Sequence, residues 1–218
     1  MRARAHDLRG MKSGSDAARA HSPSARLARL VREVRACTVC AAHLPFAPRP
    51  VLRVSPTARV LIVGQAPGRR VHASGVPWDD PSGDRLRAWL QLSREIFYDE
   101  SRIAIIPTGM CYPGKGPSGD LPPRRECAPL WHPKLRALMP DIRLTVLVGS
   151  YAQAFYLGSR RKDSLAETVR AFGDFLPEFF PLPHPSPRNV GWFQKNPWVE
   201  KEVVPEVRRR VGEILESR

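Results

Sequence analysis

Four short runs of apolar residues divide the chain at intervals typical of alternating strands and helices. They occupy residues 59–64, 102–107, 143–149 and 178–183, and the runs are continuous rather than alternating between apolar and polar positions. Continuous apolar runs are typical of strands that are buried on both faces of a parallel sheet. We therefore expect a short, mostly parallel, four-stranded central sheet.

Helical periodicity fills the segments around these runs. A first helix should begin after Ser22, which has the character of an N-cap followed by Pro23, and end near Cys37. Further helices are expected at 83–93 after a cap at Ser82, at 132–139, and at 198–217, where Pro205 marks a kink or restart. Residues 41–58 hold four prolines and read as an irregular connector.

These elements predict the fold class and the domain organisation. The class is α/β, with three α/β/α layers and ligands bound beyond the carboxyl ends of the strands. A chain of 218 residues has room for one such domain, which we place at 22–218. Residues 1–21 are polar, rich in Arg, Ala and Ser, and predict a disordered basic arm.

Composition and charge indicate which class of partner the protein binds and in which compartment it is found. The 35 Lys and Arg against 21 Asp and Glu give a net charge of +14, and +8 of this lies outside residues 1–36, where nine basic residues face three acidic ones. Such an excess favours polyanionic partners, nucleic acid first, although a solubilising surface or an origin in a high-GC, Arg-rich genome gives the same net charge. No stretch resembles a membrane span or a secretory signal, which favours a cytoplasmic protein without a membrane partner.

Four cysteines are candidate metal ligands. Cys37 and Cys40 are separated by two residues, and Cys111 and Cys127 by fifteen. Nothing in the sequence suggests export, and a domain of this size can be stable without disulfides. Two disulfides are therefore a weaker interpretation than reduced thiols or a metal site.

Two glycine- and proline-rich loops follow predicted strands and should open on the same edge of the sheet. In the first, Gly64-Gln65-Ala66-Pro67-Gly68, the glycines allow close approach of a ligand and Gln65 offers an amide. The second is His184-Pro185-Ser186-Pro187-Arg188-Asn189. Its histidine can face developing negative charge, and Ser186 and Arg188 can contact phosphates. Neither loop has the glycine spacing of a P-loop or a dinucleotide-binding fold, and each on its own could be a plain turn.

Aromatic and basic residues follow the second loop. Trp192, Phe193 and Trp198 surround Lys195, a mixture found where proteins bind unstacked bases and their backbone. For any one of the three aromatic residues, core packing is the better interpretation.

In combination, these motifs resemble the uracil-DNA glycosylase superfamily. The resemblance rests on the two loops in this order, on residues 75–90 with the sequence GVPWDDPSGDRLRAWL, on CYPG at Cys111 and on the layout of residues 123–149. The last of these is most like the iron-sulfur branch, often called family 4, of largely bacterial and archaeal enzymes. The resemblance covers roughly residues 30–215.

The resemblance implies a glycosylase of base excision repair. Such an enzyme flips a deaminated base out of DNA and hydrolyses its N-glycosidic bond, leaving an abasic site. His184 would then stabilise the departing base anion, and Gln65, Gly64, Ala66 and Gly68 would shape the pocket and position water. The partner would be single- or double-stranded DNA that contains a damaged base, and the protein would associate with the bacterial nucleoid when it acts on DNA. No motif bears on oligomeric state, and a monomer is the expectation.

The resemblance also implies roles for residues outside the first loop. Trp78 would stack under the flipped base, and Ser186, Pro187 and Arg188 would pinch the DNA. Lys195 would contact its backbone. The four cysteines would hold a structural [4Fe-4S] cluster, with zinc as the second choice and free thiols as the third.

Two positions depart from the family pattern and leave the substrate open. Pro107 stands where the family has an asparagine that reads uracil, so Thr108, Asn189 or backbone groups would read the base, or another lesion is the substrate. Gln65 stands where the iron-sulfur branch has glutamate, so base assistance would have to come from elsewhere, such as Asp79 or Asp80. A glycosylase-fold protein that binds DNA or abasic sites with little excision is therefore the alternative function. An acyl or phosphoryl hydrolase lacks both a nucleophile elbow and a P-loop.

Overall fold

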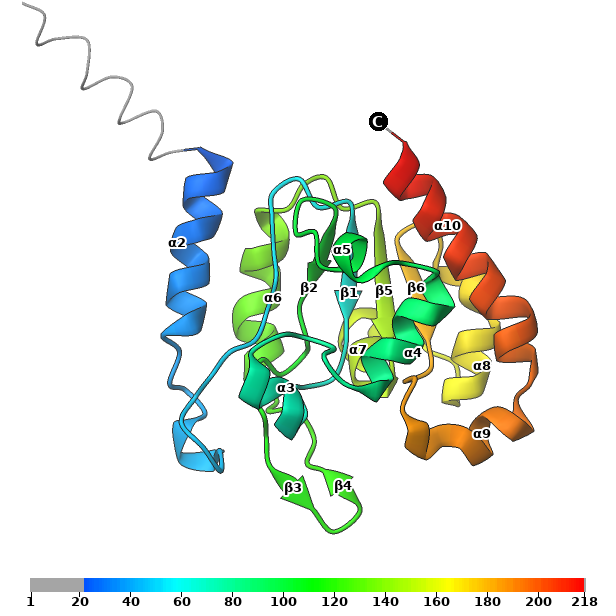
Figure 1. The fold of residues 1–218 in the computed structure, drawn as a ribbon, viewed down its shortest axis with the longest axis horizontal. Coiled ribbons are helices and arrows are strands. Elements are labelled where there is room, and N and C mark those ends of the chain that lie inside the picture. Colours follow the sequence, from blue (N-terminus) through cyan, green and yellow to red (C-terminus); the bar gives the residue numbers. More distant parts are fainter. Residues whose placement is uncertain (1–21, 218) are drawn as a thin grey trace, which may run out of the picture.

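The computed structural model describes residues 22–217 and has a parallel four-stranded sheet between two layers of helices (Figure 1). The predicted disordered arm, residues 1–21, lies outside the described residues. The strands lie in the order β2-β1-β5-β6, and all three pairings are parallel. Their bounds are β1 Val60–Val63, β2 Ile103–Ile105, β5 Leu144–Val148 and β6 Phe179–Leu182. The three-layer α/β/α prediction is confirmed.

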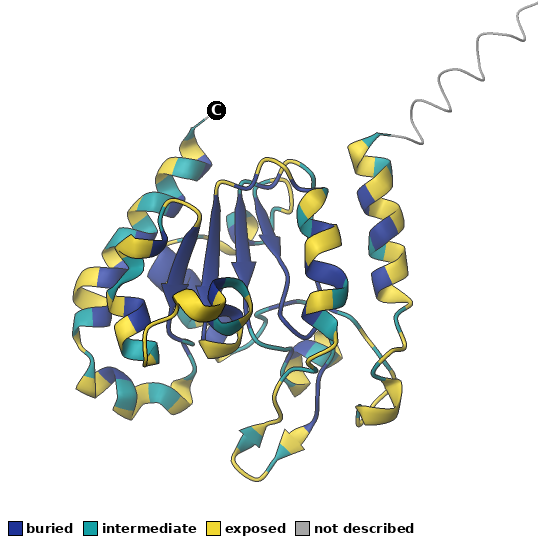
Figure 2. Ribbon diagram, turned by 180° about the vertical axis from the view of Figure 1, so that it is seen from behind, coloured by how far each residue is buried: buried dark blue, intermediate teal, exposed yellow. Residues whose placement is uncertain are grey.

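All four strands are buried along their whole length (Figure 2), as the continuous apolar runs predicted. Pro181 lies inside β6, where its missing N–H is tolerated because β6 is an edge strand paired only with β5. A second, two-stranded sheet is an antiparallel hairpin formed by β3 (Lys115–Gly116) and β4 (Gly119–Asp120). This hairpin projects from the edge of the domain near α3 (Figure 1).

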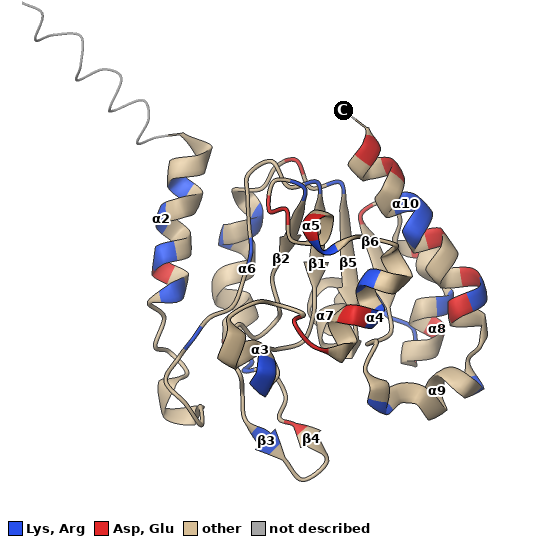
Figure 3. Cartoon of the chain, in the orientation of Figure 1, with Lys and Arg blue, Asp and Glu red and all other residues tan. Residues whose placement is uncertain are grey.

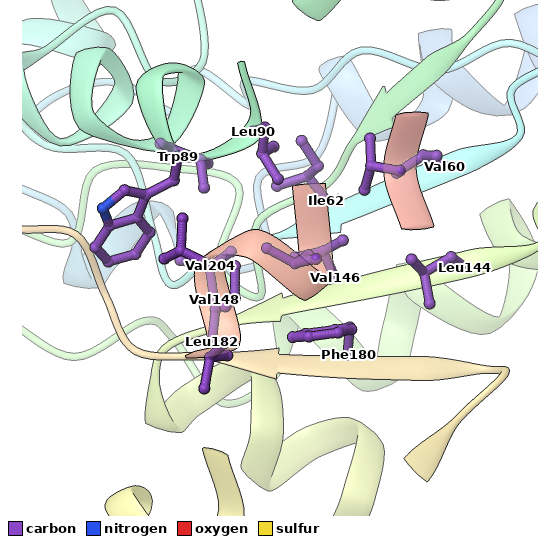
Figure 4. Packing of buried hydrophobic residues seen from close by; sticks show 14 of the residues in the cluster. Val60, Ile62, Trp89, Leu90, Leu144, Val146, Val148, Phe180, Leu182 and Val204 are labelled. Carbon is purple, nitrogen blue, oxygen red and sulfur yellow. The ribbon is translucent and has the colours of Figure 1, made fainter. Parts of the chain in front are cut away.

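Helices cover both faces of the central sheet, and each face has its own hydrophobic core. One core packs strand residues against α2 (Pro23–Arg35), α6 (Cys127–Ala137) and α7 (Ser150–Leu157). The other, part of which is seen in Figure 4, packs the opposite strand face against α4 (Pro81–Leu90), α5 (Arg94–Phe97), α8 (Leu165–Arg170), α9 (Val190–Lys195) and α10 (Val204–Glu216). The remaining helical segments are α3 (Arg69–Ser74), four 3₁₀ turns at Ala41–His43, Gly158–Arg160, Phe172–Phe175 and Pro187–Asn189, and a π-helical turn at Val199–Val203.

The helix predictions hold in outline, and one cap is corrected. α2 begins after Ser22, whose side chain accepts a hydrogen bond from the N–H of Ala25. The cap of α4 is Asp80 rather than the predicted Ser82, because the Asp80 carboxylate accepts from the N–H of Gly83 and leaves Ser82 buried inside the helix. Pro205 restarts the last helix as predicted, after the π-helical turn.

The third predicted helix is longer than its sequence pattern indicated. α6 begins at Cys127, five residues before the predicted start, and accommodates Pro133 in its interior. Among the described residues, no helix is long and apolar enough to cross a membrane.

Candidate functional site

A pocket of about 540 Å³ opens at the carboxyl ends of the central strands and gathers both predicted loops. It is lined by all five residues of the first loop, Gly64–Gly68, and by five of the second, His184, Ser186, Pro187, Arg188 and Asn189. Trp78, Asp80, Pro107 and the turn after β5 complete much of the wall. The expectation that the two loops share one edge of the sheet is confirmed.

The first loop is held by the segment that follows β2. The N–H of Thr108 donates to the carbonyl of Gly64 over 3.0 Å, and the N–H of Gly109 donates to the carbonyl of Gln65 over 2.8 Å. The Thr108 hydroxyl adds a 2.7 Å hydrogen bond to the same Gln65 carbonyl. The backbone of the loop is therefore fixed, while the Gln65 side chain remains on the pocket wall.

Trp78 crosses the pocket wall between the two loops. Its backbone has φ of 58°, a left-handed conformation that costs a bulky residue free energy. Its indole lies so close to Gly64 that a Cβ there would approach the ring to 2.7 Å. On the other side, the ring centroid is 5.4 Å from that of His184, with an angle of 32° between the planes.

A buried arginine holds the backbone of Trp78 in this conformation. The guanidinium of Arg87, whose residue is 6% exposed, donates to the carbonyl of Trp78 over 3.2 Å and to the hydroxyl oxygen of Tyr98 over 3.1 Å. The Tyr98 hydroxyl in turn donates to the carbonyl of Pro77 over 2.9 Å. Gly83 leaves room for the turn, because a Cβ at this position would collide with the Trp78 carbonyl. Sequence reasoning missed Arg87, since an arginine on a helix is indistinguishable from a surface charge until the helix is docked.

His184 lies at the end of β6 with its side chain against the turn after β5. A Cβ at Gly149, which has φ of 90°, would lie 3.3 Å from the Cβ of His184, so glycine is required there for two reasons. Burial lowers the pKa of His184 to about 4, because the imidazolium is poorly solvated in this position. The ring is therefore neutral at pH 7, with one N–H to donate. Among residues 22–217, no group hydrogen-bonds its ring nitrogens.

The second loop is stabilised by its own side chains. The Asn189 amide donates to the carbonyl of His184 over 2.9 Å, and the Ser186 hydroxyl accepts from the N–H of Arg188 over 3.2 Å. The guanidinium of Arg188 lies against Gly119 of the β3–β4 hairpin, where a Cβ would approach Nη1 to 2.5 Å. The loop and the hairpin therefore meet across the mouth of the pocket.

Sequence analysis missed the hairpin as a pocket wall. Ser118, Gly119 and Asp120 line the pocket, and Asp120 also faces the first loop at Gly68. The glycine- and proline-rich stretch between Lys115 and Asp120 is a recognisable turn signal, but its flanking strands are too short to register as a hydrophobic pattern.

The two carboxylates named as candidate bases are placed differently. Asp80 lines the pocket, but its carboxylate caps α4, and burial raises its pKa. Asp79 pairs with Arg94 over 3.3 Å and is not part of the pocket lining. Of these two, only Asp80 faces the pocket.

Some predicted site residues lie away from the pocket. Thr108 is 4% exposed, and its hydroxyl is engaged by the carbonyls of the first loop, so it holds that loop rather than lining the pocket. Lys195 is exposed at the end of α9 and is not part of the pocket lining. Phe193 is buried, with Trp192 and Trp198 packed against the same core. The core-packing interpretation of these aromatics therefore holds.

The four cysteines line one small cavity of about 20 Å³ on the α2 and α6 side of the sheet. Burial raises the pKa of Cys127 to about 12, and the N–H of Met110 donates to its sulfur over 3.4 Å. Within residues 22–217, no three Cys, His, Asp or Glu side chains are placed closely enough to hold a metal ion as they stand. The donor set, four thiols around one cavity, nevertheless has the chemistry that a thiolate-ligated cluster requires.

The fold and the pocket define an α/β protein with a pocket between glycine- and proline-rich loops at the carboxyl edge of a parallel sheet. The sequence profile of the Uracil DNA glycosylase superfamily matches residues 53–208, and the chain belongs to this superfamily. Among solved structures, the chain is similar to the solution NMR structure of a protein from Methanosarcina acetivorans that is provisionally described as a uracil DNA glycosylase. The identity is 17%, the match covers 72% of this chain and 93% of the other, and the TM-score is 0.43.

Proposed function

We propose that this protein is a monofunctional DNA glycosylase of base excision repair that removes uracil or a related deaminated base. The observation that carries the proposal is the meeting of His184, Trp78 and the first loop in one pocket at the carboxyl edge of the sheet. Membership of the Uracil DNA glycosylase superfamily supports DNA as the partner. Because an intact duplex hides the glycosidic bond, the base has to be flipped into the pocket.

In this proposal, His184 stabilises the leaving group. As the bond between C1′ and the base nitrogen breaks, its electron pair moves into the base, whose carbonyl oxygen gains negative charge. The neutral imidazole donates its N–H to that oxygen without giving up the proton. One such preorganised donor is worth about 3 to 4 kcal/mol.

Water completes the reaction. Its oxygen bonds to the cationic C1′, and one of its protons leaves to the departing base or to solvent. Gln65 supplies an amide oxygen that orients the water without accepting the proton. The carboxylates that line the pocket are Asp120 and Asp80, and the carboxylate of Asp80 also caps α4. No lysine lines the pocket among the described residues, so the pocket offers no amine for a Schiff base, which supports a monofunctional reaction.

The base is read by the pocket in a way that differs from the family pattern. Pro107 lines the pocket with no side-chain donor or acceptor, and the Asn189 amide nitrogen is already engaged with the His184 carbonyl. The Asn189 side-chain oxygen, the Gln65 amide and the loop backbone are polar groups of the pocket that could contact a base. We therefore propose weaker discrimination among uracil, hypoxanthine and xanthine than an asparagine at residue 107 would give.

We further propose that Cys37, Cys40, Cys111 and Cys127 hold a structural [4Fe-4S] cluster, with zinc as the second choice. The cluster would join the end of α2 to the start of α6 through the segment around Cys111. It lies outside the pocket lining, so it would supply stability rather than a catalytic group.

The experiment uses oligonucleotides that carry one uracil, hypoxanthine or xanthine, both single- and double-stranded. After incubation with the protein, alkali cleaves each strand at abasic sites. The proposal expects cleavage with at least one lesion by the wild type and cleavage about 100- to 1,000-fold slower by His184→Ala. Retention of DNA in a gel without cleavage of any lesion favours the alternative, a DNA- or abasic-site-binding protein, for which Gln65 and Pro107 are the supporting observations.

A further inference from the structure

An exposed aromatic ring lies beside the pocket and belongs to neither hydrophobic core. Phe46 is 46% exposed. Its ring stacks on that of His72, with centroids 5.3 Å apart and planes 21° apart, and lies near-parallel to that of Tyr112 at 6.2 Å. We call Phe46, His72 and Tyr112 the aromatic platform. Phe46 is the most exposed of the three rings, and an exposed aromatic ring beside cations is the arrangement on which nucleic-acid bases stack.

The rings beneath Phe46 are held in place. Arg49 donates to the carbonyls of His72 and Ala73, each over 2.7 Å. Burial, together with the nearby Arg49, lowers the pKa of His72, so its ring is neutral at pH 7 and stacks without a charge. Tyr112 is 5% exposed, and its hydroxyl lies 3.5 Å from the carboxylate of Asp120. Phe46 is therefore supported from behind.

Exposed basic residues precede His72 on α3 and follow Tyr112 in the chain. Arg69 and Arg70 are exposed on α3, and Lys115 is exposed on β3; Figure 3 shows the basic residues of both elements. Arg69 is close enough to Tyr112 to act on its pKa. In the part of the chain that the structure describes, none of these three cations lies within 4.0 Å of a carboxylate.

The platform and the pocket share α3 and the hairpin. Val71, between Arg70 and His72, lines the pocket, as does Gly68 at the start of the helix. Asp120 lines the pocket and also contacts Tyr112. A nucleic-acid strand leaving the pocket over α3 would therefore meet the three cations and then Phe46.

We infer that an unpaired base stacks on Phe46, the exposed ring of the aromatic platform. This base would belong to the same DNA strand as the flipped base, a few nucleotides away, and Arg69, Arg70 and Lys115 would hold the phosphates between the two bases. Exposed aromatic rings among cations bind single-stranded nucleic acid because every base has a stacking face and every linkage has a charge. A base stacked on Phe46 would extend the pair of rings already formed with His72. The location relative to the lesion rests on the proposed function, while the stacking itself does not.

The test measures dissociation constants for fluorescently labelled single-stranded oligonucleotides that carry a stable tetrahydrofuran abasic analogue. Phe46→Ala is expected to weaken binding about 5- to 150-fold, the range for loss of one stacked base. Phe46→Leu keeps most of the apolar area without a π face and should lose the same affinity, whereas Phe46→Trp should retain it. Phe155→Ala, which truncates an aromatic side chain of α7 that is 37% exposed, is the matched control and should bind as the wild type does. Circular dichroism checks that each variant folds.

The cations have a separate readout. Exchanging Arg69, Arg70 and Lys115 together for glutamine should lower the slope of log K against log salt by about 0.7 per lost phosphate contact.

Each outcome decides between the two proposals. If the wild type excises a base but Phe46→Ala and Phe46→Leu bind DNA with unchanged affinity, the stacking inference is wrong and the proposed glycosylase function is supported. If Phe46→Leu binds as tightly as the wild type while Phe46→Ala does not, Phe46 packs rather than stacks, and the inference fails. If no base is excised yet Phe46→Ala and Phe46→Leu bind DNA more weakly, the stacking inference is supported and the glycosylase proposal is wrong. If the wild type does not bind the single-stranded oligonucleotide, the stacking inference is wrong, and the excision experiment alone decides the proposed function.

Discussion

The indole of Trp78 lies beside the imidazole of His184, with ring centroids 5.4 Å apart, although 105 residues separate them in the chain. One ring follows the first loop and the other begins the second, so their contact joins the two motifs into one pocket wall. Trp78 can take this position only because residue 64 has no Cβ. The geometry of the pocket therefore depends on a small number of close approaches, each of which a single substitution can test.

Gly64→Ala should displace the Trp78 indole, since the new Cβ would come to 2.7 Å from the ring. We expect a loss of about 1 to 3 kcal/mol in unfolding free energy from overpacking, and a several-fold fall in excision as the stacking surface moves. Gly212→Ala, in α10 with nothing within 4 Å of the new Cβ, is the control and should raise stability by about 0.5 to 1 kcal/mol. Denaturant melts and single-turnover rates provide the two measurements. Equal behaviour of the two variants would show that Trp78 does not depend on Gly64.

Arg87→Met should loosen the turn that presents Trp78. The substitution leaves the Trp78 carbonyl without the guanidinium and removes a donor from the Tyr98 hydroxyl, which costs about 1 to 3 kcal/mol for buried polar groups. Its ion pair with Asp84 adds little, because the Asp84 side chain is 72% exposed. Arg29→Met, which breaks an exposed pair with Glu33, should cost at most about 0.5 kcal/mol. The tryptophan fluorescence spectrum should shift in Arg87→Met and remain constant in Arg29→Met. If Arg87→Met has the spectrum and the stability of the wild type, Arg87 does not hold the backbone of Trp78.

His132 should make the protein less stable in mild acid. Burial lowers its pKa from 6.5 to about 4, and its neutral ring both donates to the Pro107 carbonyl and accepts from the Tyr156 hydroxyl. The folded state therefore resists protonation, while the unfolded chain takes up a proton as the pH falls below about 6.5. Stability from this residue is complete above pH 6.5 and is lost as the pH falls to about 4, by about 3 kcal/mol at most.

The measurement is the unfolding free energy from pH 7 to pH 4. His132→Gln should be less stable at pH 7 and show a shallower decline towards pH 4 than the wild type. The control, His43→Gln, replaces an exposed histidine and should keep the wild-type slope. A slope in His132→Gln as steep as in the wild type would assign the acid sensitivity to other groups.

The proposed [4Fe-4S] cluster at the four cysteines predicts that the protein absorbs visible light. Anaerobically purified wild type should show a broad visible absorption band and contain about four iron atoms per chain. Cys111→Ala should lose the band and melt at a lower temperature, while any excision that remains should retain its dependence on His184, because the cysteine cavity and the pocket have separate linings. A colourless wild type that contains zinc would replace the cluster with a zinc site.

The sheet and its functional edge were predictable because they depend on local patterns. Continuous apolar runs marked all four strands, and the positions of the two loops after β1 and β6 placed Gly64 and His184 on one edge. Side-chain roles were less accessible to sequence reasoning. Thr108 was proposed as a reader of the base, but its hydroxyl serves the backbone of the first loop. The burial of Arg87 depends on how α4 packs against the neighbouring segments at Trp78 and Tyr98, and the contact of Arg188 with the hairpin arises only when distant elements dock.

The central claim is tested most directly by measuring free base released from DNA under single-turnover conditions. Oligonucleotides with one uracil, hypoxanthine or xanthine are incubated with excess protein, and the released base is quantified by mass spectrometry against the abasic sites formed. The account predicts equal amounts of base and abasic site with at least one lesion, and a rate about 100- to 1,000-fold lower in His184→Ala, with DNA affinity retained. No released base from any lesion, or a rate unchanged in His184→Ala, would contradict it.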